Sequence, residues 1–404
     1  MATVTLSALS EVMKDAYEKA IPYFLNTTLP LWNFLKLKQL PFAGEPNFVI
    51  PMQLSLNEGS AWQAENDATP TALIPTFDQC QLSWKKLVGA MRVSEETIDL
   101  TKGANTLIDG LKRNVESLVK AVKLDLDQAM HGDGTGKLAQ SSAVDDGQVI
   151  TCATGVHNIR VGMVLDGYDL DATPNNDAAN VVVTAVDLVN NQFTVTGTIT
   201  AVDAVTAFYK NGTHTGDLGS ATAPNGLDNI VSDTGTFQNC DRSSLAFMQA
   251  IEIDGASAGT AESLTFSRMR SVGDRLTRDM AGEVGDLIYT SIGVKNAFVD
   301  LMRADHQPIE AMPNKWGFTG SHKYVYDGKE IPIVASRLAA MNSMFFLSRK
   351  HMFKYLGTMG FADRDGFLQR IAGYLAYEAI WRAWVNFGTD MPRSLGRLND
   401  ITEA

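Results

Sequence analysis

The chain has 404 residues, a formal net charge of −12, 20% charged residues and 45% hydrophobic residues. This length is typical of roughly two to three domains. The ordinary apolar content, with 33 Gly and 13 Pro, excludes a disordered or collagen-like chain. The acidic balance excludes a broad surface for nucleic acid or anionic membranes, because such a surface needs an excess of Lys and Arg.

The three cysteines, Cys80, Cys152 and Cys240, are far apart in the sequence and form no CxxC pair. Their odd number and wide spacing argue against a disulfide framework or a structural zinc site. We therefore expect three buried, reduced thiols. The first ten residues have neither a basic segment nor a long apolar one, so no signal peptide is predicted. No stretch approaches 18 uninterrupted apolar residues, so no transmembrane helix is predicted.

The N-terminal 40 residues are predicted to form helical pieces. Apolar residues between positions 9 and 20 recur at helical spacing, and prolines then interrupt the helix. The following stretch carries Trp32 and Phe34 among other apolar residues. So apolar a segment must be covered, either by the chain's own core or by a neighbouring subunit.

Two alternating segments, 52–56 and 80–84, predict a pair of strands. The interval between them, 57–72, is long and polar, which predicts a hairpin that projects from its domain. Long loops in compact domains are usually functional or disordered. A disordered surface loop is the alternative. Trp62 favours a functional loop, since exposed tryptophans are typical of contacts across interfaces.

The strongest predicted helix runs from Ala104 to Met130. Its apolar residues recur at spacings of three and four, and its other face carries acid-first i,i+4 ion pairs. At 1.5 Å per residue it would be about 40 Å long, which is the length of a structural strut. The glycine-rich run Gly132–Gly136 follows it. This run lacks the Ser or Thr of a phosphate loop and follows a helix, so it predicts a helix-terminating turn.

From residue 140 to 220 the composition shifts to Val, Thr, Asn, Asp and Gly, in short β-branched runs divided by turn residues. This pattern predicts an inserted all-β domain of about 80 residues, either a barrel or a sandwich.

The remainder of the chain is predicted to be mixed α and β. The expected elements are helices at 264–280 and 294–302, strands at 286–290, 331–334 and 343–347, and a segment at 367–386 that is open between helix and strand.

Ser257 lies in the one motif that indicates catalysis, because Gly255–Gly259 matches the nucleophile elbow GxSxG. A serine nucleophile needs a histidine base and an acid that orients it, and the six histidines occur singly with no recognisable context. No HExxH or calcium-loop spacing occurs. We therefore predict a protein that is not an enzyme and has no catalytic, cofactor or metal site, with a serine hydrolase using Ser257 as an alternative.

The order of these parts resembles the major capsid proteins of tailed bacteriophages, with the Hong Kong ninety-seven-type capsid fold. That family runs through an N-terminal arm, an extended loop, a long spine helix, a glycine-rich turn, an axial domain and a return to the peripheral domain. The likeness is most telling at the junction, where Gly132–Gly136 matches the glycine turn and Pro224–Asn229 resembles the P-x-G-L/I-x-N segment that follows it. Residues 287–291 and 330–347 resemble the family's axial strands.

The resemblance implies an α+β phage capsid fold with an inserted small all-β domain. The implied segments are the N-terminal arm, 1–45; the extended loop and flanking peripheral-domain strands, 46–92; the spine helix and glycine turn, 93–139; the inserted β-rich domain, 140–223; the axial domain, 224–375; and the return to the peripheral domain, 376–404.

The function implied by the resemblance is structural. Copies of the chain would form hexamers and pentamers of an icosahedral shell that encloses double-stranded DNA without sequence-specific binding, cofactor or membrane. The shell would be the virion capsid, assembled in the bacterial host cytoplasm with separate scaffolding and portal proteins and possible decoration protein. The implied inter-subunit contacts are Trp32, Phe34, Trp62, Glu65 and Asp67.

Two variations within the family bear on this sequence. Some members lock the shell with a covalent Lys–Asn bond from the extended loop, but no lysine occurs between Asn57 and Asp78, so no such bond is expected. Other members carry a long N-terminal scaffold segment that is later cleaved. Here the arm begins almost at Met1, so a separate scaffolding protein is expected. Two alternatives to a phage shell remain: an encapsulin-like nanocompartment with an enzyme cargo, and a non-shell phage protein or adhesin whose β insert binds glycans.

Overall fold

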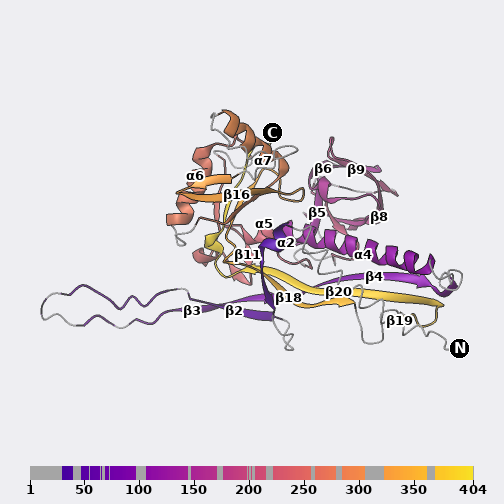
Figure 1. The fold of residues 1–404 in the computed structure, drawn as a ribbon, viewed down its shortest axis with the longest axis horizontal. Helices are drawn as coiled ribbons and strands as arrows, with labels where there is room; N and C mark the ends of the chain where they lie inside the picture. The colour runs from indigo at the N-terminus through magenta and orange to yellow at the C-terminus, as the bar shows by residue number, and fades with distance from the viewer. Residues whose placement is uncertain are drawn as a thin grey trace. The chain divides into compact units, whose positions relative to one another are not determined.

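The computed structural model divides the chain into two compact units (Figure 1). Unit 1 takes its described residues from Met1–Phe42, Lys85–Asn229 and Phe353–Phe387, and unit 2 from Ala43–Trp84, Ile230–Met352 and Gly388–Ala404. The helix expected at 9–20 lies outside the described residues. The structure describes residues 30–39, 47–53, 55–63, 65, 69–71, 73–96, 106–143, 147–170, 176–197, 199, 202, 205–214, 222–255, 260–278, 284–304, 323–361 and 369–403.

The sheet of unit 1 is built around one long strand, β20 (Ala376–Thr389). β4 (Lys85–Ser94) pairs with it antiparallel through ten consecutive residue pairs. The sheet is completed by β1 (Lys36–Gln39), β18 (Met352–Phe361) and β19 (Gln369–Arg370). Alternate β20 side chains, including Trp381 and Val385, are buried, which is the period of a strand with one covered face. This resolves as strand the segment that the sequence left open.

α4 (Thr106–His131) packs against β4 and confirms the helix predicted at 104–130. Its buried side chains, among them Val115, Val122 and Leu126, lie on one face, as the apolar spacing requires. The two elements approach closely at Gly89, where a Cβ would lie 3.0 Å from side-chain atoms of both Leu118 and Val122. The helix therefore rests directly on the strand.

The β-rich insert forms a closed six-stranded barrel, which settles the choice between barrel and sandwich (Figure 1). The strands follow the barrel order β10 (Ala207–Lys210), β5 (Lys137–Ser141), β6 (Val149–Thr154), β9 (Gln192–Thr196), β8 (Asn176–Asp187) and β7 (Val164–Tyr168). Side chains such as Ile150, Val183, Phe193 and Phe208 fill its interior, so it is a packed core and not a channel.

Unit 2 contains a six-stranded mixed sheet with two longer helices. The strand order is β13 (Ile251–Ile253), β21 (Gly396–Leu398), β17 (Met344–Leu347), β14 (Leu287–Thr290), β16 (Lys329–Ala335) and β15 (Lys323–Tyr326). α6 (Phe266–Leu276) and α7 (Ile292–Ala304) contribute Val272 and Phe298 to the core. The predicted helices and strands of this region are thereby confirmed, with ends that differ by a few residues.

The last strands of the chain belong to different units. β20 belongs mostly to unit 1, whereas β21 inserts between β13 and β17 of unit 2. Strand pairing over a gap of more than 140 residues decides this placement, and no local pattern encodes it.

The remaining short elements are α2 (Pro30–Phe34), α5 (Leu227–Ile230), β11 (Thr236–Phe237), β12 (Cys240–Asp241) and the 3-10 turns Val156–Asn158, Ala246–Met248 and Pro392–Ser394.

β2 (Asn47–Gln53) and β3 (Phe77–Ser83) form the predicted hairpin, paired in register over all seven residues (Figure 1). The expectation of three reduced thiols is wrong for two of them, because Cys80 of β3 and Cys240 of β12 form a disulfide. Tertiary folding brings these residues together across a sequence separation of 160, which the spacing rules do not detect. Cys152 is a buried, reduced cysteine, as expected.

The second half of the junction motif, Pro224–Asn229, packs against the end of α4. A Cβ at Gly226 would lie 2.6 Å from the carbonyl oxygen of Ala129 and closer still to that of Gly132. The backbone NH of Asn225 donates a hydrogen bond to Asn386 Oδ1 at 2.9 Å. The motif thus holds α4, its glycine turn and β20 together within unit 1.

We expect Gly226→Ala to lower the free energy of unfolding by roughly 2–3 kcal/mol or to prevent folding, because backbone oxygens cannot move aside for a methyl group. Gly147→Ala is the matched control, since a Cβ there meets no atom within 4 Å. Urea unfolding of both variants measures the effect. Equal stability of the two variants would contradict the close approach.

The disulfide gives a second prediction. Cys80→Ser and Cys240→Ser should each lower the free energy of unfolding by roughly 3–5 kcal/mol, because the bond closes a long loop in the unfolded chain. Cys152→Ala is the control and should cost about 1 kcal/mol. Urea unfolding without reductant measures the loss. Thiol counting in unfolded, non-reduced protein should find one free cysteine, and three would contradict the bond.

Candidate assembly surfaces

The root of the hairpin is anchored in unit 2. One face of the two strands carries Met52, Cys80 and Leu82, all buried. The Cys80 sulfur lies 3.7 Å from that of Met52 and 3.9 Å from that of Met248. The backbone NH of Gln81 also donates a hydrogen bond to the Gln238 carbonyl at 2.8 Å. Apolar packing, a backbone hydrogen bond and the disulfide therefore fix the root.

The loop that receives this root is itself held by a buried arginine. Arg242 lies directly after β12, and its guanidinium donates to the carbonyl oxygens of Thr234 at 2.7 Å and Met248 at 3.2 Å. It also lies 4.9 Å from the centre of the Phe237 ring. Burial lowers the pKa of Arg242 to about 10, so the side chain remains charged at neutral pH. These charge-assisted hydrogen bonds to carbonyl oxygens stabilise the loop to which the hairpin root is attached.

The far part of the hairpin exposes its apolar side chains. The NH of Thr76 donates to Ser55 Oγ at 3.0 Å, so the two arms stay together beyond the last paired residues of β2 and β3. Trp62 is fully exposed and Ile74 is 87% exposed. The exposed large apolar residues of this ribbon are Val49, Leu56, Trp62, Leu73, Ile74 and Phe77. Several large apolar side chains exposed along one hairpin are typical of a protein interface.

The hairpin is also acidic. Between residues 39 and 84 the chain carries five acidic residues and no Lys or Arg. Glu65, one of the expected contact residues, is exposed in the loop, as is Glu58. Asp67, the other expected acidic contact, lies outside the described residues. Apolar and acidic side chains thus share one exposed ribbon with no basic side chain.

Trp32 and Phe34 are placed differently from the hairpin residues. Trp32 in α2 is only 3% exposed, and its ring meets that of Phe387 edge-on with centroids 6.2 Å apart. The buried Lys354 ammonium donates to the Trp32 carbonyl at 2.7 Å and lies 4.5 Å from the centre of its ring. Trp32 therefore belongs to the core of unit 1 and has little surface left for another subunit, whereas Phe34 is half-buried.

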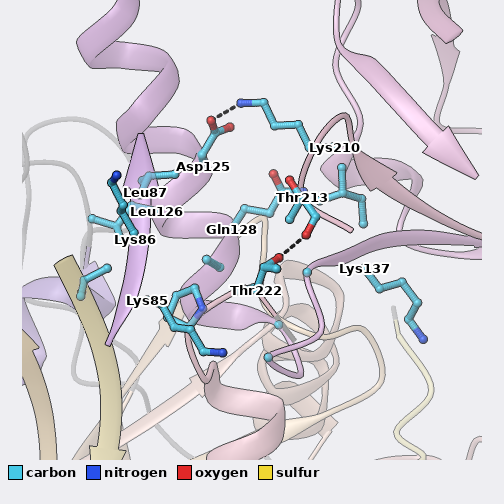
Figure 2. A pocket seen from close by; sticks show the side chains of 18 of the residues that line it. Lys85, Lys86, Leu87, Asp125, Leu126, Gln128, Lys137, Lys210, Thr213 and Thr222 are labelled. Atoms are coloured by element: carbon cyan, nitrogen blue, oxygen red, sulfur yellow. Dashed lines mark hydrogen bonds and ion pairs between the residues drawn. The ribbon is translucent and has the colours of Figure 1, made fainter. Parts of the chain in front are cut away.

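A cavity of 390 Å³ lies in unit 1, at the point where α4 ends (Figure 2). It is lined by residues of β4, the end of α4 and the glycine turn, and by residues 210–213 and 222–224. Four of these residues are lysines, namely Lys85, Lys86, Lys137 and Lys210. No local pattern in the sequence indicated this cavity, because its lining comes from segments more than 100 residues apart.

His131 ends α4 and is buried beside this junction. Its Nδ1 donates to the Asp127 carbonyl at 2.6 Å, and the Asp127 carboxylate is 3.8 Å away. Burial lowers the pKa of His131 to about 4, against the raising effect of the Asp127 hydrogen bond, and a charge on His157 would lower it further. His131 is therefore neutral at physiological pH.

Ser257, the nucleophile of the alternative serine hydrolase, lies outside the described residues. Within the described ranges, no cluster of three His, Cys, Asp or Glu side chains could hold a metal ion. None of the helices in those ranges has both the length and the apolar character needed to cross a membrane.

No protein-family model and no curated protein matches the sequence. Among solved structures, the chain is similar to the capsid asymmetric unit of cyanophage A-1(L), with a TM-score of 0.56 and 13% identity over 93% of each chain. It is also similar to the capsids of native and empty GTA particles, with TM-scores of 0.51 and 0.50. These two share 9% and 10% identity and are matched over 93% of this chain and 91% of theirs. The chain thus has the α+β phage capsid fold, and the fold prediction is confirmed.

The burial of His131 predicts a loss of stability in acid. Its pKa falls from 6.5 in the unfolded chain to about 4 in the folded one, so between these values the unfolded state binds more protons. Stability is therefore complete above pH 6.5 and falls as the pH drops toward 4, by roughly 2.5 kcal/mol between pH 7 and 4.5. Urea unfolding at both pH values should show this loss reduced by that amount in His131→Gln. An equal loss in the two proteins would contradict the assignment.

Proposed function

We propose that this chain is the major capsid protein of a tailed bacteriophage. Copies of it assemble as hexamers and pentamers into an icosahedral shell that encloses double-stranded DNA. The observation that carries the proposal is the capsid fold itself, matched to three capsid chains over more than nine-tenths of both partners. In this reading the protein is a building block of the virion and not an enzyme.

The hairpin supports assembly as the mechanism. In the part of the chain that the structure describes, no second layer covers the outer residues of the two-stranded ribbon. Trp62, Ile74 and Phe77 are therefore exposed to water until another molecule covers them. Burying one large apolar side chain is worth about 1.5–3 kcal/mol. Several such side chains per subunit, repeated in every copy, supply a driving force for closing a shell. The disulfide and the packing of Cys80 against Met52 and Met248 anchor the root of this hairpin in unit 2.

The charge of the chain suits a container for DNA. A net charge of −12 gives no general affinity for a polyanion, so the shell can hold DNA without binding its sequence and release it later.

Separate scaffolding and portal proteins complete the assembly in the host cytoplasm, and a decoration protein is a further candidate partner. The barrel is the part most suited to a role outside the shell contacts, since its core is complete without the sheets.

The test is electron microscopy of the purified protein after expression in bacteria. Closed shells of uniform diameter are expected, because apolar hairpins must find neighbours. Ile74→Ser with Phe77→Ser should keep the thermal stability of the subunit but abolish shells, whereas Leu188→Ser with Val189→Ser, two exposed apolar residues on a barrel turn, is the matched control and should leave shells intact.

Two outcomes would contradict the proposal. Monomers or small oligomers at every concentration and salt condition would exclude self-assembly of this chain. Shells from phage-producing cells that contain an enzyme and no nuclease-protected DNA would instead identify a nanocompartment.

A further inference from the structure

The cavity at the end of α4 has a charge opposite to that of the chain as a whole. Four lysines line it, and Asp125 is the one acidic residue among its described lining residues. Asp125 already forms an ion pair with Lys210 (Figure 2). It also forms one with Arg160, at 2.7 Å. Its charge is therefore spent on those two cations. An excess of positive charge remains around the cavity in a protein whose net charge is −12.

The cavity is also apolar in part. Leu87, Leu126, Leu138 and Val385 contribute to its walls beside the lysines. Among the lysines, Lys86 is exposed. A volume of 390 Å³ is within the range of sites that hold a ligand. Its occupant must therefore combine a bulky apolar group with negative charge.

The tip of the hairpin has this combination of properties. Trp62 is fully exposed, and Glu58 and Glu65 lie on either side of it in the sequence. No Lys or Arg occurs within 20 residues on either side of Trp62. An indole gains both from burial against leucines and from a nearby ammonium group. Adjacent carboxylates gain from the lysines that line the cavity.

We propose that Trp62 of one subunit inserts into this cavity of a second copy, with Glu58 and Glu65 facing its lysines. The inference rests on the proposed function, since it assigns the partner of the hairpin within a shell. It also explains two separate features by one contact: an exposed tryptophan in an acidic ribbon, and a basic, partly apolar cavity. The sign of the charge then selects this docking position over the acidic remainder of the surface.

Photo-crosslinking tests the contact without disturbing the fold, because position 62 is fully exposed. Benzoylphenylalanine replaces Trp62, the assembled protein is irradiated, and cross-linked peptides are identified by mass spectrometry. The proposal expects inter-subunit cross-links to peptides that contain 85–88, 126–138 or 210–224. The same amino acid placed at Val189, an exposed barrel residue, should not label these peptides. Cross-links from position 62 that map elsewhere overturn the proposal.

A charge exchange tests the lysines independently. Lys85→Glu with Lys86→Glu should raise the protein concentration needed for assembly about tenfold. Adding Glu58→Lys with Glu65→Lys in the same chain should restore assembly, which a variant that fails to fold could not do. Lys36→Glu with Arg370→Glu changes two exposed cations of unit 1 outside the cavity and is the matched control.

The outcomes separate this inference from the proposed function. If wild-type protein forms no shells, the proposed function fails. If shells form but cross-links map elsewhere, or if the charge exchange restores nothing in a folded protein, only the inference fails. If Lys85→Glu with Lys86→Glu abolishes binding of inorganic phosphate in calorimetry while shells form at wild-type concentration, the cavity is a site for small anions and the docking proposal is overturned.

Discussion

The pairing of β4 with β20 is the constraint on which unit 1 depends. Ten consecutive residue pairs join a strand near the start of the chain to one near its end. α4 then rests on β4, at a contact so close that a Cβ at Gly89 would lie 3.0 Å from side-chain atoms of both Leu118 and Val122. The junction motif with Gly226 holds the end of that helix. Without β4 and the junction motif, the apolar face of this long helix would have too few packing partners. Helices draw most of their stability from such packing.

α4 covers one face of β4, whereas no described element covers the far part of the hairpin in this way. Only one face of β2 and β3 is covered, by residues of unit 2 that surround Cys80 and Met248. Beyond this root, none of the described residues forms a second layer over Trp62 or Ile74. A partly apolar ribbon is therefore available to another molecule. Its acidic character and the basic cavity at the end of α4 divide the charge of one chain into two complementary surfaces, although the net charge of −12 shows only the sum.

The sequence predicted those parts of the fold that are encoded locally. The stripe that includes Val115, Val122 and Leu126 has one helical period, so α4 was predictable to within two residues. The alternation in β2 and β3 likewise predicted a hairpin. By contrast, Trp381 and Trp384 lie in an aromatic-rich segment whose period is ambiguous until β4 pairs with it.

The parts of the candidate site that escaped prediction depend on contacts between distant residues. Cys80 meets Cys240 across 160 residues, and Lys354 covers Trp32 across 322, so neither the disulfide nor the burial of that tryptophan has a local signal. The cavity joins Lys85 to Lys210 in the same way. Trp62 was identified because an exposed tryptophan in a polar loop is unusual in itself, which is a property of the loop alone.

The account's central claim is that the exposed ribbon of one subunit is buried by another. A cryo-electron microscopy map of assembled particles, at a resolution that shows side chains, measures this directly. The account predicts that Trp62, Ile74 and Phe77 are covered by a neighbouring copy in every hexamer subunit. Particles in which these three side chains remain in solvent would contradict it.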